Sequence, residues 1–266
     1  MKEKRDIFSM ITIMIALLVI LFIGSAICAI IIGGFPNLLD AFSSKEIRFA
    51  FGLSISTSCI STIVVMVLAL PTAYALTRTN MPLKKAAGVI IELTLSLPFI
   101  LLGLSLLILF STNAGKMLKD IGFKVIFSPI GIIMAHILVN LPYAIRLIRT
   151  AMEEVDVRLE FIAQSLGASK FKSFLTILLP MCKHSLISTT ILTWSRALGE
   201  FGATLMLVGI TRFKTETLPG SIYLSISTGN NSMAMATATI MLIISAVTIA
   251  VSNYINHSKQ LNRGDR

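Results

Sequence analysis

Six long apolar runs decide what this chain can fold into. They cover residues 7–32, 51–76, 87–110, 127–148, 186–210 and 233–254, and each is close to the ~20 residues that a helix needs to cross a bilayer core. Hydrophobic residues make up 55% of the 266 positions, and charged residues only 14%, whereas soluble domains carry roughly 25% charged residues. The pattern predicts an all-α, polytopic membrane protein with six transmembrane helices.

The domain organisation follows from the same runs. They leave little chain outside the membrane, so we expect a single transmembrane domain over residues 1–266, with its core at 50–255. The first run is much longer than the 7–15 apolar residues of a secretory signal core, which favours a retained span. Three cysteines lie in or beside apolar runs without a paired spacing, which indicates neither a disulfide framework nor a metal site.

The formal charge of +10 is distributed between the apolar runs and does not form a stripe, which argues against a nucleic-acid partner. Lysine and arginine are concentrated at the amino end, after the second run, between the fourth and fifth runs, and in the tail. By the positive-inside rule, this bias predicts a multi-pass protein of the cell (inner) membrane with both termini in the cytoplasm. The stretch 153–180 then also faces the cytoplasm.

That polar stretch predicts two short amphipathic helices separated by a break. Apolar residues recur at helical spacing on both sides of the break, at Leu159, Ile162, Ala163 and Leu166 and then at Phe171, Phe174, Leu175 and Leu178. Gly167 supplies the left-handed residue that ends the first helix, and Ser169 is positioned to cap the second. Pro180 is expected to stop the second helix. Paired helices of this kind, outside the membrane, indicate a docking surface.

The fifth run contains two ionisable residues four positions apart, Arg196 and Glu200. On a continuous helix they lie one above the other, and the expense of a charge at membrane depth predicts that they pair. Such a pair either fixes helix packing or serves a transport pathway. Small residues accompany it at Ser195, Gly199, Gly202 and Ala203. They predict a close helix interface, within one subunit or across a dimer axis.

The stretch 153–180 resembles the alanine-glycine loop of binding-protein-dependent ABC importer permeases. Five positions match its spacing: Ala163, Gly167, Ile177, Leu179 and Pro180. Phe161 and Ile162 stand where that family has Glu and Ala, and Glu160 comes one residue early. In that family the loop is a coupling helix seated in a cleft of a cytoplasmic ATPase. The resemblance therefore implies ATPase coupling by Leu159, Glu160, Phe161, Ile162, Ala163, Leu166, Gly167, Ala168 and Ser169.

A second segment, Arg196 to Thr204, is similar to the fifth-span signature of oxyanion permeases, the molybdate, tungstate and sulfate branch. The segment Thr215 to Tyr223 is most similar to the molybdate and tungstate members. Further matches at 70–78 and 141–146 extend the resemblance over most of the chain from the second run to the sixth. From their charge and small size, we expect Ser195, Arg196, Gly199, Glu200, Gly202 and Ala203 to belong to the pathway or the dimer interface.

The resemblance implies the permease subunit of an ATP-driven molybdate/tungstate importer that works by alternating access. Its expected partners are a second copy of itself, two ABC ATPase subunits, an external substrate-binding protein, the oxyanion and the lipid bilayer. No GxxxxGK[ST] sequence occurs, so we expect no enzymatic, cofactor or metal site in this chain, with ATP and Mg²⁺ on the partner ATPase. A sulfate/thiosulfate permease is the first alternative. An ATP-independent secondary transporter is the second, although it has no need of the docking loop.

Overall fold

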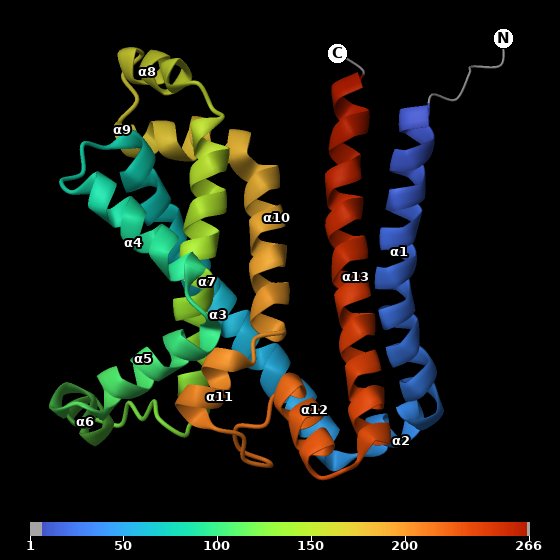
Figure 1. The fold of residues 1–266 in the computed structure, drawn as a ribbon. Helices are drawn as coiled ribbons and strands as arrows, with labels where there is room; N and C mark the ends of the chain where they lie inside the picture. The colour runs from blue at the N-terminus through green and yellow to red at the C-terminus, as the bar shows by residue number, and fades with distance from the viewer. Residues whose placement is uncertain (1–6, 265–266) are drawn as a thin grey trace.

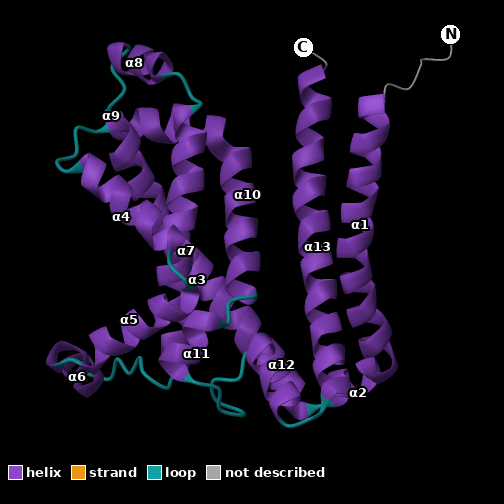
Figure 2. Ribbon diagram, in the orientation of Figure 1, coloured by secondary structure: helices purple, strands orange, loops and turns teal. Residues whose placement is uncertain are grey.

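The computed structural model describes residues 7–264, and this part of the chain is helical without strands (Figures 1 and 2). Residues 1–6 and 265–266, which carry some of the charges used to orient the chain, lie outside the described residues. Five helices or helix groups are long and apolar enough to cross a membrane, and a bent pair of helices makes six if the pair is counted as one span. The prediction of an all-α polytopic protein is confirmed.

The crossings follow one another along the chain. Their bounds are α1 (Ile7–Gly34), α3 (Lys45–Arg78), α4 (Lys84–Ser96) with α5 (Phe99–Ser111), α7 (Pro129–Glu153), α10 (Leu179–Leu198) and α13 (Asn231–Gly264). The pair α4 and α5 is bent by 114° at the break that contains Pro98, within the apolar run 87–110. Proline lacks the backbone donor that would continue the helix and disfavours helical geometry in the residue before it.

Short helices fill the ends and the breaks between crossings. They are α2 (Leu38–Ser43), α6 (Asn113–Asp120), α8 (Val157–Ser165), α9 (Lys170–Ser173), α11 (Gly202–Val208) and α12 (Leu218–Ser227). A 3₁₀ turn (Phe35–Asn37) follows α1, and a π turn (Phe174–Leu178) joins α9 to α10.

The packing has α3 and α7 at its centre. One buried apolar cluster joins α3, α7 and α10 near the end that carries α8, and a second joins α5, α7 and α11 nearer the other end. Helix α1 lies beside α13, apart from the main body, and most of its side chains are exposed (Figure 1). At its last turn, Gly33 and Gly34 bring the α1 backbone against Met235 and Thr239 of α13.

Two sequence predictions about α10 are wrong. Pro180 does not stop the second coupling helix, because the π turn before it accommodates the missing donor and the helix continues from α9 into α10. The run 186–210 is not one helix either. Helix α10 ends at Leu198, Gly199 to Phe201 are non-helical, and α11 begins at Gly202.

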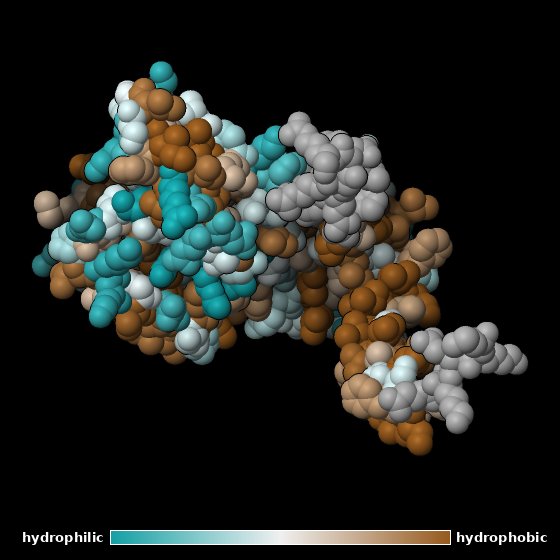
Figure 3. Space-filling view, turned by 90° about the horizontal axis from the view of Figure 1, so that it is seen from above, coloured by the Kyte–Doolittle hydropathy of each residue, from teal (hydrophilic) through white to brown (hydrophobic). Residues whose placement is uncertain are grey.

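The end of the molecule that carries α8 and α9 has a polar surface over the main body. Helix α1 begins and α13 ends at the end that carries α8 and α9 (Figure 1). Seen from that end, hydrophilic residues gather over the main body, whereas the α1 side is mostly hydrophobic (Figure 3). Together with the long apolar helices, this surface is that of a membrane-embedded bundle in which α8 and α9 lie at a polar end.

Candidate functional site

The break between the two coupling helices forms as the sequence predicted. Asp156 caps α8 by accepting a hydrogen bond from the Arg158 amide at 2.9 Å. At the other end Gly167 has φ +93°, and the amides of Gly167 and Ala168 donate to the carbonyls of Gln164 and Ala163, each at 3.0 Å. This paired arrangement is the Schellman motif. Ser169 then caps α9 by accepting from the Lys172 amide at 3.2 Å.

The surface of α8 presents apolar side chains without a partner in the described chain, with Leu159, Ile162 and Leu166 on one side and Phe161 on another. Phe161 is 68% exposed, Ile162 55% and Leu166 85%, and Leu159 is also exposed. Ala163 and Ala168 are half-buried, and Gly167 and Ser169 are exposed. Because this helix lies at the polar end of the bundle, its apolar face is suited to a protein partner outside the bilayer.

Glu160 lies on the opposite side of α8 and is buried. Its carboxylate accepts a hydrogen bond from Arg78 Nε at 2.6 Å, and both side chains are less than a tenth exposed. The Ser173 hydroxyl donates to the Glu160 carbonyl at 3.4 Å, which ties α8 to α9. Glu160 is therefore an internal attachment of the coupling helix and is turned away from the exposed face.

Arg78 completes this attachment, and the sequence analysis gave it no role in coupling. It is the last residue of α3, and its Nη2 donates to the carbonyls of Met152 at 2.8 Å and Val155 at 2.7 Å, at the end of α7. One guanidinium thus joins α3, α7 and α8. A basic residue at the end of the second run was the available signal, but its partner lies 82 residues away and no local pattern points to it.

The second group of candidate residues lies at the break between α10 and α11. Glu200 does not pair with Arg196. Its carboxylate accepts hydrogen bonds from the amides of Ala203 at 2.7 Å and Thr204 at 3.1 Å, and from the Thr204 hydroxyl. The predicted pair required a continuous helix, and the helix ends at Leu198. Glu200 instead caps α11, where a carboxylate stabilises the free amides of the first turn.

The guanidinium of Arg196 lies between two aromatic rings. Its Cζ is 5.0 Å from the ring centroid of Phe99, at the start of α5, and 4.8 Å from that of Tyr143, in α7. Among the described residues no hydrogen bond or ion pair joins Arg196, and its Nε is buried without a partner. The site therefore holds an arginine with cation–π contacts and without a counter-charge.

The small residues of the break divide into two kinds. Ala203 packs on Gly103 of α5 so closely that a Cβ on Gly103 would overlap the Ala203 backbone, and a Cβ on Gly202 would lie 3.4 Å from the Ile100 nitrogen. These positions form a close helix interface within the subunit. Ser195 is half-buried and Gly199 is exposed, and neither lies in that contact.

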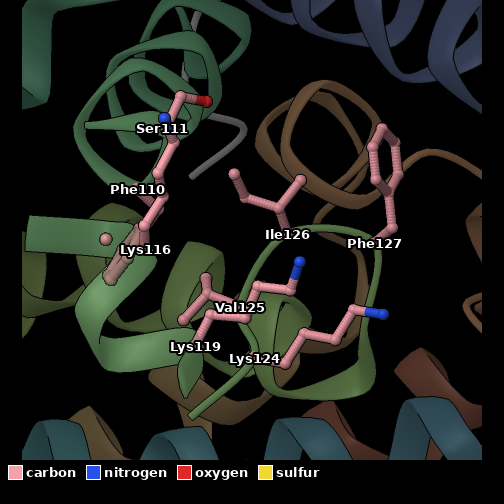
Figure 4. A pocket seen from close by; sticks show the side chains of 9 residues that line it. Phe110, Ser111, Lys116, Lys119, Lys124, Val125, Ile126 and Phe127 are labelled. Carbon is pink, nitrogen blue, oxygen red and sulfur yellow. The ribbon is translucent and has the colours of Figure 1, made fainter. Parts of the chain in front are cut away.

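The opposite end of the molecule carries a basic pocket of about 400 Å³. Lys116 and Lys119 of α6 and Lys124 of the following loop line it together with apolar residues, and no acidic side chain does (Figure 4). In Figure 4, Lys119 and Lys124 extend toward the same side of the pocket. The pocket residues precede the first residue of α7, whereas α8 follows its last, so the two surfaces lie at opposite ends of that helix.

Comparison with known proteins identifies the scaffold. Residues 66–259 match the model of the family described as "Binding-protein-dependent transport system inner membrane component". The chain belongs to this family. It is an ABC importer permease of the molybdate/sulfate branch, since its relatives carry the names of permeases in that branch.

Three relatives illustrate the branch. The probable transport system permease NifC of Clostridium pasteurianum is 36% identical over 74% of this chain and 70% of its own length. The molybdenum transport system permease ModB of Haemophilus influenzae is 32% identical over 81% of this chain and 96% of its own length. The sulfate transport system permease CysT of Salmonella typhimurium is 29% identical over 79% of this chain and 76% of its own length.

Solved structures agree on the fold. A subunit of a bacterial alginate ABC transporter in complex with a periplasmic protein aligns with a TM-score of 0.79 at 18% identity, over 95% of this chain and 94% of that one. A subunit of the MetNI methionine ABC transporter, in an inward-facing conformation, aligns with a TM-score of 0.65 at 17% identity, over 81% of this chain and 98% of that one. These likenesses concern the fold alone.

Proposed function

We propose that this permease works as a homodimer that imports a tetrahedral oxyanion, molybdate or tungstate, driven by two ABC ATPase subunits that dock on α8. The observation that carries the proposal is the exposed apolar face of α8, which Arg78 and Glu160 fasten to the membrane helices. A docking helix transmits motion only when it is attached firmly to the elements that must move. The attachment joins α8 to α3 and α7, the two central helices of the bundle.

The choice of anion rests on the relatives. ModB of Haemophilus influenzae matches over nearly its whole length, and the segment Thr215 to Tyr223 is most similar to molybdate and tungstate members. Sulfate is the second candidate, because CysT of Salmonella typhimurium is almost as similar. All three anions are tetrahedral dianions, so the same pathway chemistry serves each of them. In this proposal, specificity among them lies mainly in the external binding protein.

The proposed orientation places α8 and both termini in the cytoplasm. The lysine pocket then faces outward, where the binding protein delivers its anion. Three lysines without an acidic neighbour in the pocket lining make this end attractive to an acidic protein surface and to the anion itself. ATP and Mg²⁺ remain on the ATPase subunits, and this chain contributes the path and the coupling contact.

The mechanism follows from a two-state arrangement biased by the partners. ATP binding draws the two ATPases together and carries both copies of α8 with them. Because Arg78 connects α8 to α3 and α7, these helices tilt with α8 and open the path toward the binding protein. Hydrolysis and separation of the ATPases return the helices to the inward-open state, and the anion leaves into the cytoplasm.

The test is reconstitution of the permease with its ATPase and binding protein in proteoliposomes. We expect ATP-dependent uptake of labelled molybdate that unlabelled tungstate inhibits more strongly than sulfate does. Leu166→Asp, on the exposed face of α8, should release the ATPase during purification. Leu83→Asp is the matched control, because Leu83 is 81% exposed and lies in the turn before α4, outside α8. Uptake that continues without ATP, or an ATPase that stays bound to Leu166→Asp, contradicts the proposal.

A further inference from the structure

Arg196 is a charge at membrane depth for which the described residues supply no counter-charge. Within the described chain its contacts are the rings of Phe99 and Tyr143. Glu200, four residues away, is committed to the first turn of α11 through hydrogen bonds to Ala203 and Thr204. Aromatic rings attract a guanidinium but do not neutralise it. Ionisable residues in this position mark substrate or ion pathways unless a partner within the protein satisfies them.

Two of the three helices that meet at Arg196 are interrupted there, and the third, α7, contains a proline but stays helical. Helix α4 gives way to α5 at Pro98, immediately before Phe99. Helix α10 ends two residues after Arg196. Pro142 lies inside α7, immediately before Tyr143. In Figure 1 the break between α10 and α11 lies between the two ends of α13 and at neither of them. Irregular backbone at such a depth is tolerated where it is buried in protein or lines an aqueous cavity.

The accessible surface near Arg196 includes the first turn of α5. Pro98 and Ile100 are exposed, and α5 begins without a side-chain cap. The amino end of a helix carries partial positive charge, so it adds to the field of Arg196. In contrast, the amino end of α11 already holds the Glu200 carboxylate. The positive charge of Arg196 is the main attraction for an anion here, and the uncapped first turn of α5 adds to it.

We propose that Arg196 is the counter-charge that holds the oxyanion in transit through the membrane. This inference rests on the proposed function and extends it, because it names the residue of the permease that contacts the transported anion. The guanidinium presents parallel N–H donors that match two oxygens of a tetrahedral anion, as lysine does not. Phe99 and Tyr143 hold the guanidinium in place without using its hydrogen bonds.

The experiment compares Arg196→Gln, Arg196→Lys and the control Lys214→Gln in the reconstituted transporter. Lys214 is exposed in the loop between α11 and α12. We expect Arg196→Gln to lower molybdate uptake at least about tenfold, the loss expected when a charge-assisted hydrogen bond is removed. ATP hydrolysis stimulated by the binding protein should persist. Arg196→Lys keeps the charge and should retain more uptake than Arg196→Gln, and Lys214→Gln should equal the wild type.

The midpoint temperature of unfolding distinguishes a role of Arg196 in transport from a role in helix packing. If Arg196 binds the transported anion, Arg196→Gln only removes a cation that has no counter-charge in the folded protein. The variant should then unfold at the same temperature as the wild type or higher. A parallel loss of uptake, hydrolysis and unfolding temperature would show that Arg196 only fixes helix packing through its aromatic contacts. Uptake that is unchanged in Arg196→Gln also overturns the inference.

A carboxylate of the second copy is the competing partner for Arg196. In that case Arg196→Gln should dissociate the homodimer, measured by light scattering of the purified permease, and this result overturns the inference. Failure of the proposed function appears differently, because the wild-type transporter itself would then move no oxyanion. If the wild type transports the oxyanion and Arg196→Gln transports it equally well, only the Arg196 site is rejected and the proposed function stands.

Discussion

Arg78 Nε lies 2.6 Å from Glu160 Oε1, across 82 residues of sequence, and the pair is buried where α3, α7 and α8 meet. The same guanidinium binds two carbonyls at the end of α7. Helix α8 is therefore fixed to the membrane helices by a charge pair, whereas its exposed apolar side chains stay available to a partner. The acidic residue nearest to the motif position points inward and holds the helix in place.

Removing either partner of this pair should loosen α8. Because both side chains are buried, Glu160→Gln or Arg78→Gln leaves one charge uncompensated, which costs about 3–5 kcal/mol in buried pairs. We expect faster amide hydrogen exchange in α8, and in the reconstituted transporter ATP hydrolysis with reduced uptake. Hydrogen exchange followed by mass spectrometry measures the first effect, and the ratio of anion transported to ATP hydrolysed measures the second.

The matched control is Glu153→Gln. Glu153 pairs with Arg149 at 2.8 Å on α7, but these side chains are 50% and 38% exposed. Exposed pairs contribute about 0–1 kcal/mol, so exchange in α8 and the coupling ratio should stay unchanged. Equal effects of Glu153→Gln and Glu160→Gln would mean that the buried pair has no special part in coupling.

Gly167→Ala should weaken both the fold and the docking of the ATPase. Gly167 has φ +93° with open space around it, so the added methyl meets no atom and the penalty is backbone strain of about 1–2 kcal/mol. Gly122 has the same φ and the same open space at the other end of the molecule. Both alanine variants should unfold at similarly lowered temperatures, but only Gly167→Ala should lose ATPase on co-purification. Loss of ATPase from both would attribute the effect to general instability.

The parts that sequence patterns predicted are those encoded locally. Apolar runs of sufficient length predicted the crossings, and the spacing around Gly167 and Ser169 predicted the helix break and its caps. Hydrogen bonds within four or five residues decide such features, so the sequence contains the complete signal.

The features that were missed depend on contacts distant in sequence or on competition between local structures. Arg78 and Glu160 pair across two intervening crossings, which no periodicity reveals. The Arg196–Glu200 prediction assumed that hydropathy implies one continuous helix. Glu200 gains more hydrogen bonds by capping α11 than an i, i+4 partner would supply, and Gly202 and Ala203 let α11 pack on α5. The apolar run 186–210 has the same hydropathy whether it forms one helix or two, so hydropathy alone does not reveal the break at Gly199 to Phe201.

Gly103→Ala should destabilise the permease through the contact between α5 and α11. An added Cβ would overlap the backbone oxygen and Cα of Ala203, so the two helices must separate, which costs about 1–3 kcal/mol in overpacked cores. Because the overlap is with backbone atoms, Ala203→Gly should not rescue the variant. Gly52→Ala, in open space on α3, is the control. Thermal unfolding checks this, and full rescue by Ala203→Gly would contradict the backbone origin of the strain.

The buried carboxyl of Glu216 should make the free energy of unfolding depend on pH. It lies in the loop between α11 and α12, 1% exposed, and its Oε2 has no hydrogen-bond partner in the described chain. Burial, and secondly the nearby Glu46 carboxylate, raise the pKa of Glu216 above its ordinary value of 4.5, although hydrogen bonds from Phe213 and Ser221 oppose the rise. The folded protein therefore retains a proton on this carboxyl at pH values where the unfolded chain has released it.

The free energy of unfolding should consequently fall as pH rises from 4.5 through the raised pKa of Glu216, because the folded state binds more protons than the unfolded state in that window. Glu216→Gln stays neutral and removes this loss. We expect its midpoint temperature of unfolding to exceed that of the wild type by more at pH 7.5 than at pH 4.5. If the difference between Glu216→Gln and the wild type is the same at both pH values, Glu216 is ionised without penalty and the burial argument is wrong.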